Sequence, residues 1–176
     1  MKKNQGYIHL YTGNGKGKTT AALGLALRAS GAGLRSLIIQ FMKGQHYSEL
    51  AAVHHLNGRI AIEQYGSRKF CLPEDKDRAH HRELARAGLS RAQAALADRA
   101  LDLVVCDEIV TAVYFKLVDE ADVMALLDAR HPAQELVLTG RYAWPELIAR
   151  CDLVTEMVEH RHYYAAGVAA RPGIES

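Results

Sequence analysis

Two lysines and a threonine stand among closely spaced glycines near the start of the chain, in the stretch Gly13–Thr19 (Gly-Asn-Gly-Lys-Gly-Lys-Thr). Glycines let backbone N–H groups point into one concave turn. A lysine at the end of such a turn can reach outer phosphates, and the next hydroxyl can bind Mg²⁺. An apolar run, Tyr7–Tyr11, precedes the turn, and an apolar-periodic segment, Ala21–Ser30, follows it. A strand, a glycine-rich turn and a helix in this order predict a site for a nucleoside triphosphate.

The residues expected to bind the nucleotide form one continuous stretch. They are Thr12, Gly13, Asn14, Gly15, Lys16, Gly17, Lys18, Thr19 and Thr20. The general pattern places its first glycine where this chain has Thr12, and the nearest glycine, Gly13, comes one residue later. The turn is therefore a variant form. A basic, glycine-rich turn without a ligand is the alternative, which the flanking strand and helix patterns disfavour.

Two carboxylates follow a buried-strand pattern in the middle of the chain. The apolar run Leu103–Cys106 leads directly into Asp107 and Glu108. Ligands of open parallel sheets lie at the carboxyl ends of the strands, so both carboxylates lie beside the glycine-rich turn if this strand neighbours the first. Together with the Thr19 hydroxyl they are candidate ligands of Mg²⁺, directly or through water. The alternative is a solvated acidic pair at a strand end.

Arg141 leaves another strand pattern, Leu136–Thr139, after a single glycine. A guanidinium at the carboxyl end of a strand can bind phosphate oxygens in bidentate fashion. An ordinary surface arginine is the alternative.

Apolar runs that suit parallel strands alternate with helix-periodic stretches. The runs are Tyr7–Thr12, Ser36–Phe41, Ile60–Tyr65, Leu103–Cys106, Leu136–Thr139 and Leu153–Val158. The expected helices are Lys18–Ser30, Glu49–Asn57, Asp75–Ala100, one capped by Asp119 and one opening at Pro145. In the first helix the predicted buried face consists of Leu23, Ala26, Leu27 and Ser30. The alternation predicts an α/β fold of three layers, a parallel sheet of about six strands with helices on both faces, of the P-loop NTPase (RecA-like) type.

Length and composition narrow the class of protein. The 176 residues fit one domain, residues 1–176, in which 159–176 form an irregular C-terminal segment. The 22 basic and 20 acidic residues nearly balance, which argues against a broad nucleic-acid surface. Local basic clusters suit a phosphate ligand better: Lys16, Lys18 and Lys43, and Arg141, Arg150 and Arg161. Three cysteines without a C-x-x-C pair, no signal-peptide core and no membrane-span pattern indicate the reducing cytoplasm and no membrane partner.

These motifs together resemble the ATP:corrinoid adenosyltransferases of cobalamin biosynthesis and salvage. The resemblance rests on Tyr11–Ala22, Ile39–Gly44, Asp107-Glu108, Leu138–Arg141 and Ala169–Glu175, in the same order along nearly the whole chain. The variant glycine-rich turn matches the form that is found in this family.

The resemblance implies transfer of the 5′-deoxyadenosyl group of ATP to the Co(I) centre of a corrinoid, with release of triphosphate, in adenosylcobalamin synthesis or salvage. The family holds ATP reversed relative to other P-loop enzymes, so that the ribose carbon faces cobalt. Lys18, Lys16 and Arg141 are then the expected catalytic cations, which stabilise the departing triphosphate with Mg²⁺. A flavin-type reductase that supplies electrons and a homodimer are implied as well.

Phe70 is the predicted corrinoid contact. Members of the family use a Phe-x-Trp pair after the third strand to remove the lower axial base from cobalt, and Phe70 matches the first residue of that pair. Leu72 stands where the tryptophan is found. A plain core or loop aromatic is the alternative for Phe70.

Two other functions remain open. A conventional P-loop ATPase or kinase would share Lys18, Thr19 and Glu108 but yield ADP. A non-catalytic corrinoid chaperone would bind its ligands without turnover. The variant turn and the resemblance along the chain disfavour the first, and a complete triphosphate site with both carboxylates disfavours the second.

Overall fold

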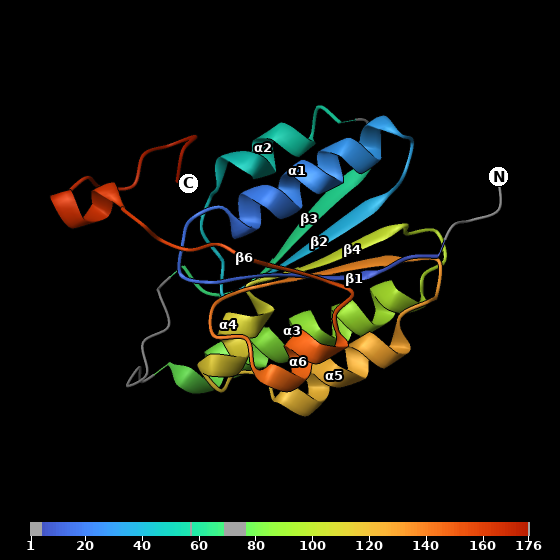
Figure 1. Cartoon of the computed structure of the whole chain (residues 1–176). Coiled ribbons are helices and arrows are strands. Elements are labelled where there is room, and N and C mark those ends of the chain that lie inside the picture. Colours follow the sequence, from blue (N-terminus) through green and yellow to red (C-terminus); the bar gives the residue numbers. More distant parts are fainter. Residues whose placement is uncertain (1–4, 57, 69–76, 176) are drawn as a thin grey trace.

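Six parallel strands form one sheet in the computed structural model, which describes residues 5–56, 58–68 and 77–175 (Figure 1). The strands are β1 (Ile8–Thr12), β2 (Ser36–Phe41), β3 (Ile60–Tyr65), β4 (Leu103–Asp107), β5 (Glu135–Thr139) and β6 (Leu153–Glu156). Their order in the sheet is β3-β2-β4-β5-β1-β6, and every pairing is parallel.

Helices cover both faces of this sheet (Figure 1). One face carries α1 (Lys18–Gly31) and α2 (Ser48–Val53). The other carries α3 (Arg78–Ala97), α4 (Ile109–Tyr114), α5 (Glu120–Ala129) and α6 (Pro145–Arg150). A short 3₁₀ helix, η1 (Tyr163–Ala166), lies in the C-terminal segment beyond β6. The predicted three-layer α/β fold of P-loop type is confirmed. No helix in the described ranges is long and apolar enough to cross a bilayer.

Each central strand buries side chains on both faces, which is why these strands are largely apolar. In β5, Leu136 and Leu138 join the core beneath α3 to α6, whereas Val137 between them joins the core beneath α1. Alternate residues of a strand point to opposite faces, so a sheet covered on both sides has few polar positions in its middle.

Two expectations about burial were wrong. In α1 the buried apolar residues are Ala22 and Ala26, whereas Leu27 is 54% exposed. The helix packs through its small side chains, which allow its backbone to lie close to the sheet. The last strand, β6, was expected to be buried, but all four of its residues are exposed. It is an edge strand that pairs only with β1 in the described part of the sheet.

Candidate active site

A short turn joins β1 to α1 and contains the glycines of the predicted phosphate site. Gly13 has φ +93° and Gly17 has φ +123°, conformations that other residues rarely adopt. A Cβ on Gly15 would lie 2.7 Å from the carbonyl oxygen of Met157, and the Gly15 N–H donates to that oxygen at 2.7 Å. The turn therefore needs glycine both to bend and to let the chain after β6 cross it closely.

Lys18 begins α1 and its side chain folds back into the turn. Its ammonium donates to the carbonyl oxygens of Gly13 at 2.7 Å and Gly15 at 2.8 Å, and the residue is only 6% exposed. Burial lowers the pKa of Lys18, the Glu108 carboxylate opposes this, and the Arg141 guanidinium lowers it further. An ammonium has three N–H donors, so one remains for a phosphate oxygen while two stabilise the turn.

The Asp107 carboxylate is fully buried at the end of β4 and accepts three hydrogen bonds from three different elements. Its Oδ1 accepts from the Thr139 hydroxyl at 2.7 Å and the Thr19 hydroxyl at 2.9 Å. Its Oδ2 accepts from the Lys43 ammonium at 2.8 Å. β4 does not neighbour β1, because β5 lies between them. Asp107 still meets the turn because α1 packs over β4 as well as β1, and Thr19 in its first turn donates to Asp107.

Glu108 follows Asp107 in a left-handed conformation, with φ +63°, and lines the cavity beside the turn. Its N–H donates to Thr139 Oγ1 at 2.9 Å, and its carboxylate accepts from the Thr111 hydroxyl. Mg²⁺ takes few protein oxygens when phosphates and water supply the others. The donor set of Thr19 and Glu108 fits such an ion, whereas the oxygens of Asp107 already accept three hydrogen bonds and suit an outer position.

The turn lines a cavity of about 760 Å³. The predicted site residues on its wall are Asn14, Gly15, Lys16, Gly17, Lys18, Thr19, Thr20, Glu108 and Arg141. Thr12 and Asp107 are buried at the ends of their strands. The C-terminal segment supplies the facing wall through Glu159, His162, Tyr164, Ala165 and Gly173–Glu175.

A second cavity, of about 400 Å³, adjoins the first, and the two share the residues Lys43, Tyr47, Glu108 and Arg141. Its other aromatic lining residues are Tyr114, Phe115 and Tyr142. The rings of Tyr114 and Tyr142 have their centroids 4.1 Å apart. The Arg141 N–H donates to Thr111 Oγ1 at 2.9 Å, which fixes the backbone from which the guanidinium extends. The polar cavity along the turn and the aromatic cavity thus meet at Lys43, Arg141 and Glu108.

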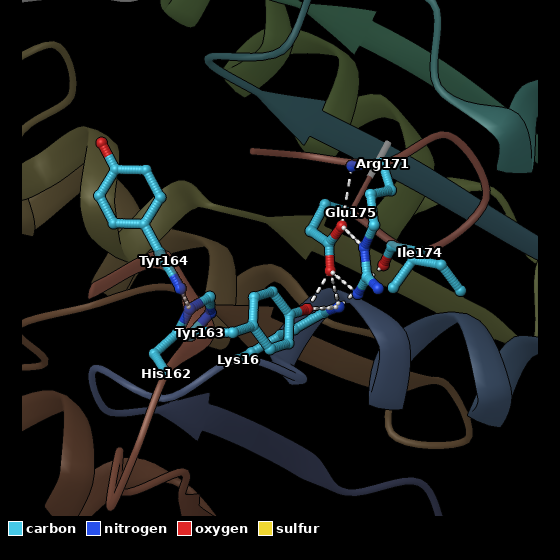
Figure 2. A network of polar contacts seen from close by, with 7 residues as sticks. All are labelled: Lys16, His162, Tyr163, Tyr164, Arg171, Ile174 and Glu175. Carbon is cyan, nitrogen blue, oxygen red and sulfur yellow. Dashed lines mark hydrogen bonds and ion pairs between the residues drawn. The ribbon is translucent and has the colours of Figure 1, made fainter. Parts of the chain in front are cut away.

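The predicted phosphate ligand Lys16 is held by the C-terminal segment. Its ammonium donates to Glu175 Oε1 at 2.9 Å, to the Ile174 carbonyl oxygen at 2.9 Å and to the Tyr163 hydroxyl at 3.1 Å. Figure 2 shows Lys16, Tyr163 and Arg171 converging on the Glu175 carboxylate. Hydrogen bonds to Glu175 and Tyr163 raise the pKa of Lys16, and hydrogen bonds from Arg171, Tyr163 and Lys16 hold the pKa of Glu175 well below its ordinary range.

The structure therefore brings together most of the predicted residues, and Phe70 lies outside the described residues. Sequence reasoning gave no role to Thr139 and named Lys43 only as part of a basic cluster. Lys43 comes directly after Met42 at the end of a strand, the same signal that pointed to Asp107 and Arg141, and could have been found by it.

The chain is similar to known proteins over nearly its whole length. The sequence pattern of the family described as ATP:corrinoid adenosyltransferase BtuR/CobO/CobP matches residues 4–176. A corrinoid adenosyltransferase from Pseudomonas aeruginosa is 33% identical over 175 residues, which cover 99% of this chain and 85% of the relative. Corrinoid adenosyltransferase CobA from Salmonella typhimurium is 32% identical, over 99% of this chain and 87% of the relative. One from Escherichia coli is 33% identical, over 97% and 86%.

Solved structures of low sequence identity share the fold. A KaiC-like protein from Pyrococcus horikoshii superimposes with a TM-score of 0.54 at 15% identity, covering 88% of this chain and 72% of that one. The RadB recombinase superimposes with a TM-score of 0.53 at 16% identity, covering 88% and 75%. These likenesses support the RecA-like arrangement of the sheet.

Proposed function

The chain belongs to the family of ATP:corrinoid adenosyltransferases, and we propose that it transfers the 5′-deoxyadenosyl group of ATP to the Co(I) centre of a corrinoid and releases triphosphate. The observation that carries this proposal is the junction between the cavity along the turn and the aromatic cavity. Transfer from the 5′ carbon needs the leaving group and the acceptor on opposite sides of one atom. Two adjoining cavities of different character offer those two places.

The triphosphate lies along the turn, with the ribose directed toward the second cavity. The N–H groups of the turn, the N-terminus of α1 and the Lys18 ammonium meet its charge. Thr19 and Glu108 would hold Mg²⁺. When bound, the ion neutralises part of the charge that grows on the departing triphosphate. Asp107 orients the Thr19 hydroxyl through their 2.9 Å hydrogen bond.

The corrinoid presents its cobalt at the aromatic cavity. Tyr114 and Tyr142 supply flat apolar surface for a macrocycle, and Phe70 is proposed as a further contact. The Co(I) electron pair attacks the 5′ carbon directly, so no proton has to be removed and no general base is required. The protein has to align the two reactants and stabilise negative charge, for which Arg141 at the junction and Lys16 in the turn join Lys18.

The proposal extends to the surroundings of the reaction. A flavin-type reductase delivers the electrons that generate Co(I), and the protein works as a cytoplasmic homodimer of single-domain chains in adenosylcobalamin synthesis or salvage. The matches to corrinoid adenosyltransferases over nearly the whole chain support this context.

One assay tests the proposed reaction. The protein is incubated anaerobically with ATP, Mg²⁺ and chemically reduced cobalamin, and we expect a light-sensitive Co–C product and inorganic triphosphate in equal amounts. ADP as the only nucleotide product would overturn the proposal in favour of a conventional ATPase. Tight corrinoid binding without any product would favour a chaperone.

A further inference from the structure

Lys43 lies where the two cavities meet, two residues after the end of β2 at Phe41. Its side chain is only 15% exposed, and it belongs to the wall of both cavities. Arg141 is the only other cation with this double position among the described residues.

The backbone around Lys43 is held in an unusual conformation. Met42, the preceding residue, has φ +60°, which side-chain-bearing residues rarely adopt. The next residue, Gly44, crosses Gly66 so closely that a Cβ on Gly44 would lie 2.1 Å from the Gly66 carbonyl oxygen. A Cβ on Gly66 would lie 2.3 Å from the Lys43 nitrogen. These contacts hold the backbone of Lys43 in the position from which its side chain reaches the junction. Strain of this kind is typical of functional sites.

The Lys43 ammonium is positioned by two hydrogen bonds and one ring. It donates to Asp107 Oδ2 at 2.8 Å and to Thr19 Oγ1 at 3.3 Å, and it lies 5.1 Å from the centre of the Tyr47 ring. Burial lowers the pKa of Lys43, but the charge of Asp107 and the hydrogen bond to it outweigh burial and raise the pKa above its ordinary value. Two of its three N–H donors are used within the described structure, and the third is left for a ligand.

The chemistry of adenosyl transfer requires a cation at this place. The cobalt electron pair forms the Co–C bond, the C5′–O5′ bond breaks, and its electron pair stays on O5′ of the triphosphate. The leaving group thus gains one negative charge at its α-phosphate end, the end nearest the acceptor. Donors that are in place before the reaction stabilise such charge most effectively.

We propose that Lys43 contacts the α-phosphate end of the nucleotide and stabilises the triphosphate as it leaves. The proposal rests on the function proposed above. The alternative is that Lys43 only neutralises the buried Asp107 carboxylate, and the two roles make different predictions.

The direct test compares Lys43→Met with the unchanged protein in calorimetric titrations with inorganic triphosphate and with ATP, both with Mg²⁺. Because the contact strengthens as charge develops, we expect the affinity for triphosphate to fall at least tenfold and the affinity for ATP to fall less. The kcat for adenosyl transfer should fall about a hundredfold with little change in KM for ATP.

Lys43→Arg, which keeps the charge, should retain most of the affinity for triphosphate. Lys116→Met, at an exposed lysine that lines neither cavity, is the matched control and should behave as the unchanged protein.

A double variant, Lys43→Met with Asp107→Asn, separates contact with the triphosphate from neutralisation of Asp107. It also removes the unpaired buried carboxylate that could cause Lys43→Met alone to misfold. In an Asp107→Asn background there is no carboxylate to neutralise. A loss of triphosphate affinity that arises only because Asp107 is left without a counter-charge would therefore not occur there. We expect Lys43→Met to weaken triphosphate binding in that background as well. Equal triphosphate affinity of Asp107→Asn and the double variant, or an unchanged affinity of Lys43→Met, would overturn the proposal. Failure of the proposed function would instead show in the unchanged protein, as ADP in place of the adenosylated product.

Discussion

The Lys16 ammonium and the Glu175 carboxylate lie 2.9 Å apart, so a cation of the phosphate-binding turn is paired with an anion of the C-terminal segment. Figure 2 shows that Tyr163 and Arg171 complete this cluster. The Lys16 ammonium donates all three of its N–H groups to this segment, so a phosphate oxygen that binds Lys16 has to displace its contact with Tyr163, Ile174 or Glu175.

This pairing predicts that Glu175→Gln loosens the C-terminal segment. Without the carboxylate, Lys16 and Arg171 lose their charged partner, and backbone amides of residues 162–175 should exchange hydrogen several-fold faster. Hydrogen exchange measured by mass spectrometry checks this, with Glu146→Gln, an exposed residue on α6, as control. Unchanged exchange in Glu175→Gln would show that the segment is held by other contacts.

The charges of Glu175 and Lys16 also predict that the C-terminal segment stays equally well protected from hydrogen exchange over a broad range of pH. The pKa of Glu175 lies below its ordinary value of 4.5, so its contribution is complete above that value and is lost as the pH falls below it. The pKa of Lys16 lies above its ordinary value of 10.5, so its contribution is complete below that value and is lost at higher pH. We expect protection of residues 162–175 from hydrogen exchange, corrected for the intrinsic exchange rate, to stay constant between these two values. A loss of protection within this range would show that groups other than Lys16 and Glu175 hold the segment.

Lys18→Ala should reduce adenosyl transfer at least a hundredfold. One preorganised donor to developing charge contributes about 3 kcal/mol in comparable sites, and Lys18 also holds the carbonyl oxygens of Gly13 and Gly15. Steady-state rates measured with pre-reduced cobalamin check this, and circular dichroism shows whether the fold is retained. A normal rate in a folded variant would remove the assigned role.

Glu108→Gln should weaken the binding of Mg²⁺ while leaving the sheet intact. The amide keeps the size of the side chain and can still accept from the Thr111 hydroxyl, but it loses the negative charge that attracts the ion. We expect the Mg²⁺ concentration for half-maximal rate to rise at least tenfold. Glu83→Gln, at a side chain 82% exposed on α3, is the control. An unchanged Mg²⁺ requirement in Glu108→Gln would assign the ion to other ligands.

Two glycines within helices should respond in opposite directions to alanine. A Cβ on Gly88 of α3 would lie 2.9 Å from Phe41 Cε1, and Phe41 is fully buried. Overpacking costs about 1–3 kcal/mol, against about 0.5–1 kcal/mol gained from helix propensity, so Gly88→Ala should lower the free energy of unfolding by about 1 kcal/mol. Gly24 of α1 has no atom within 4 Å of such a Cβ, and Gly24→Ala should raise the free energy of unfolding by about 0.5–1 kcal/mol. Urea titrations of both variants measure the difference, and a gain in both would show that α3 can shift away from the sheet.

Much of the fold could be predicted because buried parallel strands are apolar on both faces. The runs Ser36–Phe41 and Ile60–Tyr65 coincide with β2 and β3. Helix α4 was not predicted, because Ile109–Tyr114 continues the apolar run of β4 after only two carboxylates. The buried face of α1 was predicted from Leu23, Ala26, Leu27 and Ser30, but the helix is rotated so that Ala22 and Ala26 face the sheet and Leu27 faces outward.

Site residues could be predicted where they are neighbours in the sequence or follow the end of a strand. The glycine-rich turn carries its chemistry in consecutive residues, and strand ends pointed to Asp107, Glu108 and Arg141. The pairing of Lys16 with Glu175 joins the turn to an irregular segment without periodicity, so no local pattern could indicate it. The place of Asp107 depends on strand order, which the sequence does not reveal.

The turn is thus synthesised long before the C-terminal segment that contacts it. Lys16 and Glu175 are 159 positions apart, and a ribosome that adds about 5–20 residues per second needs on the order of 10 s to pass from one to the other. Met157, whose carbonyl oxygen anchors Gly15, also emerges late. A nascent chain therefore lacks the C-terminal wall of the cavity along the turn until the residues from Glu159 to Glu175 have been made.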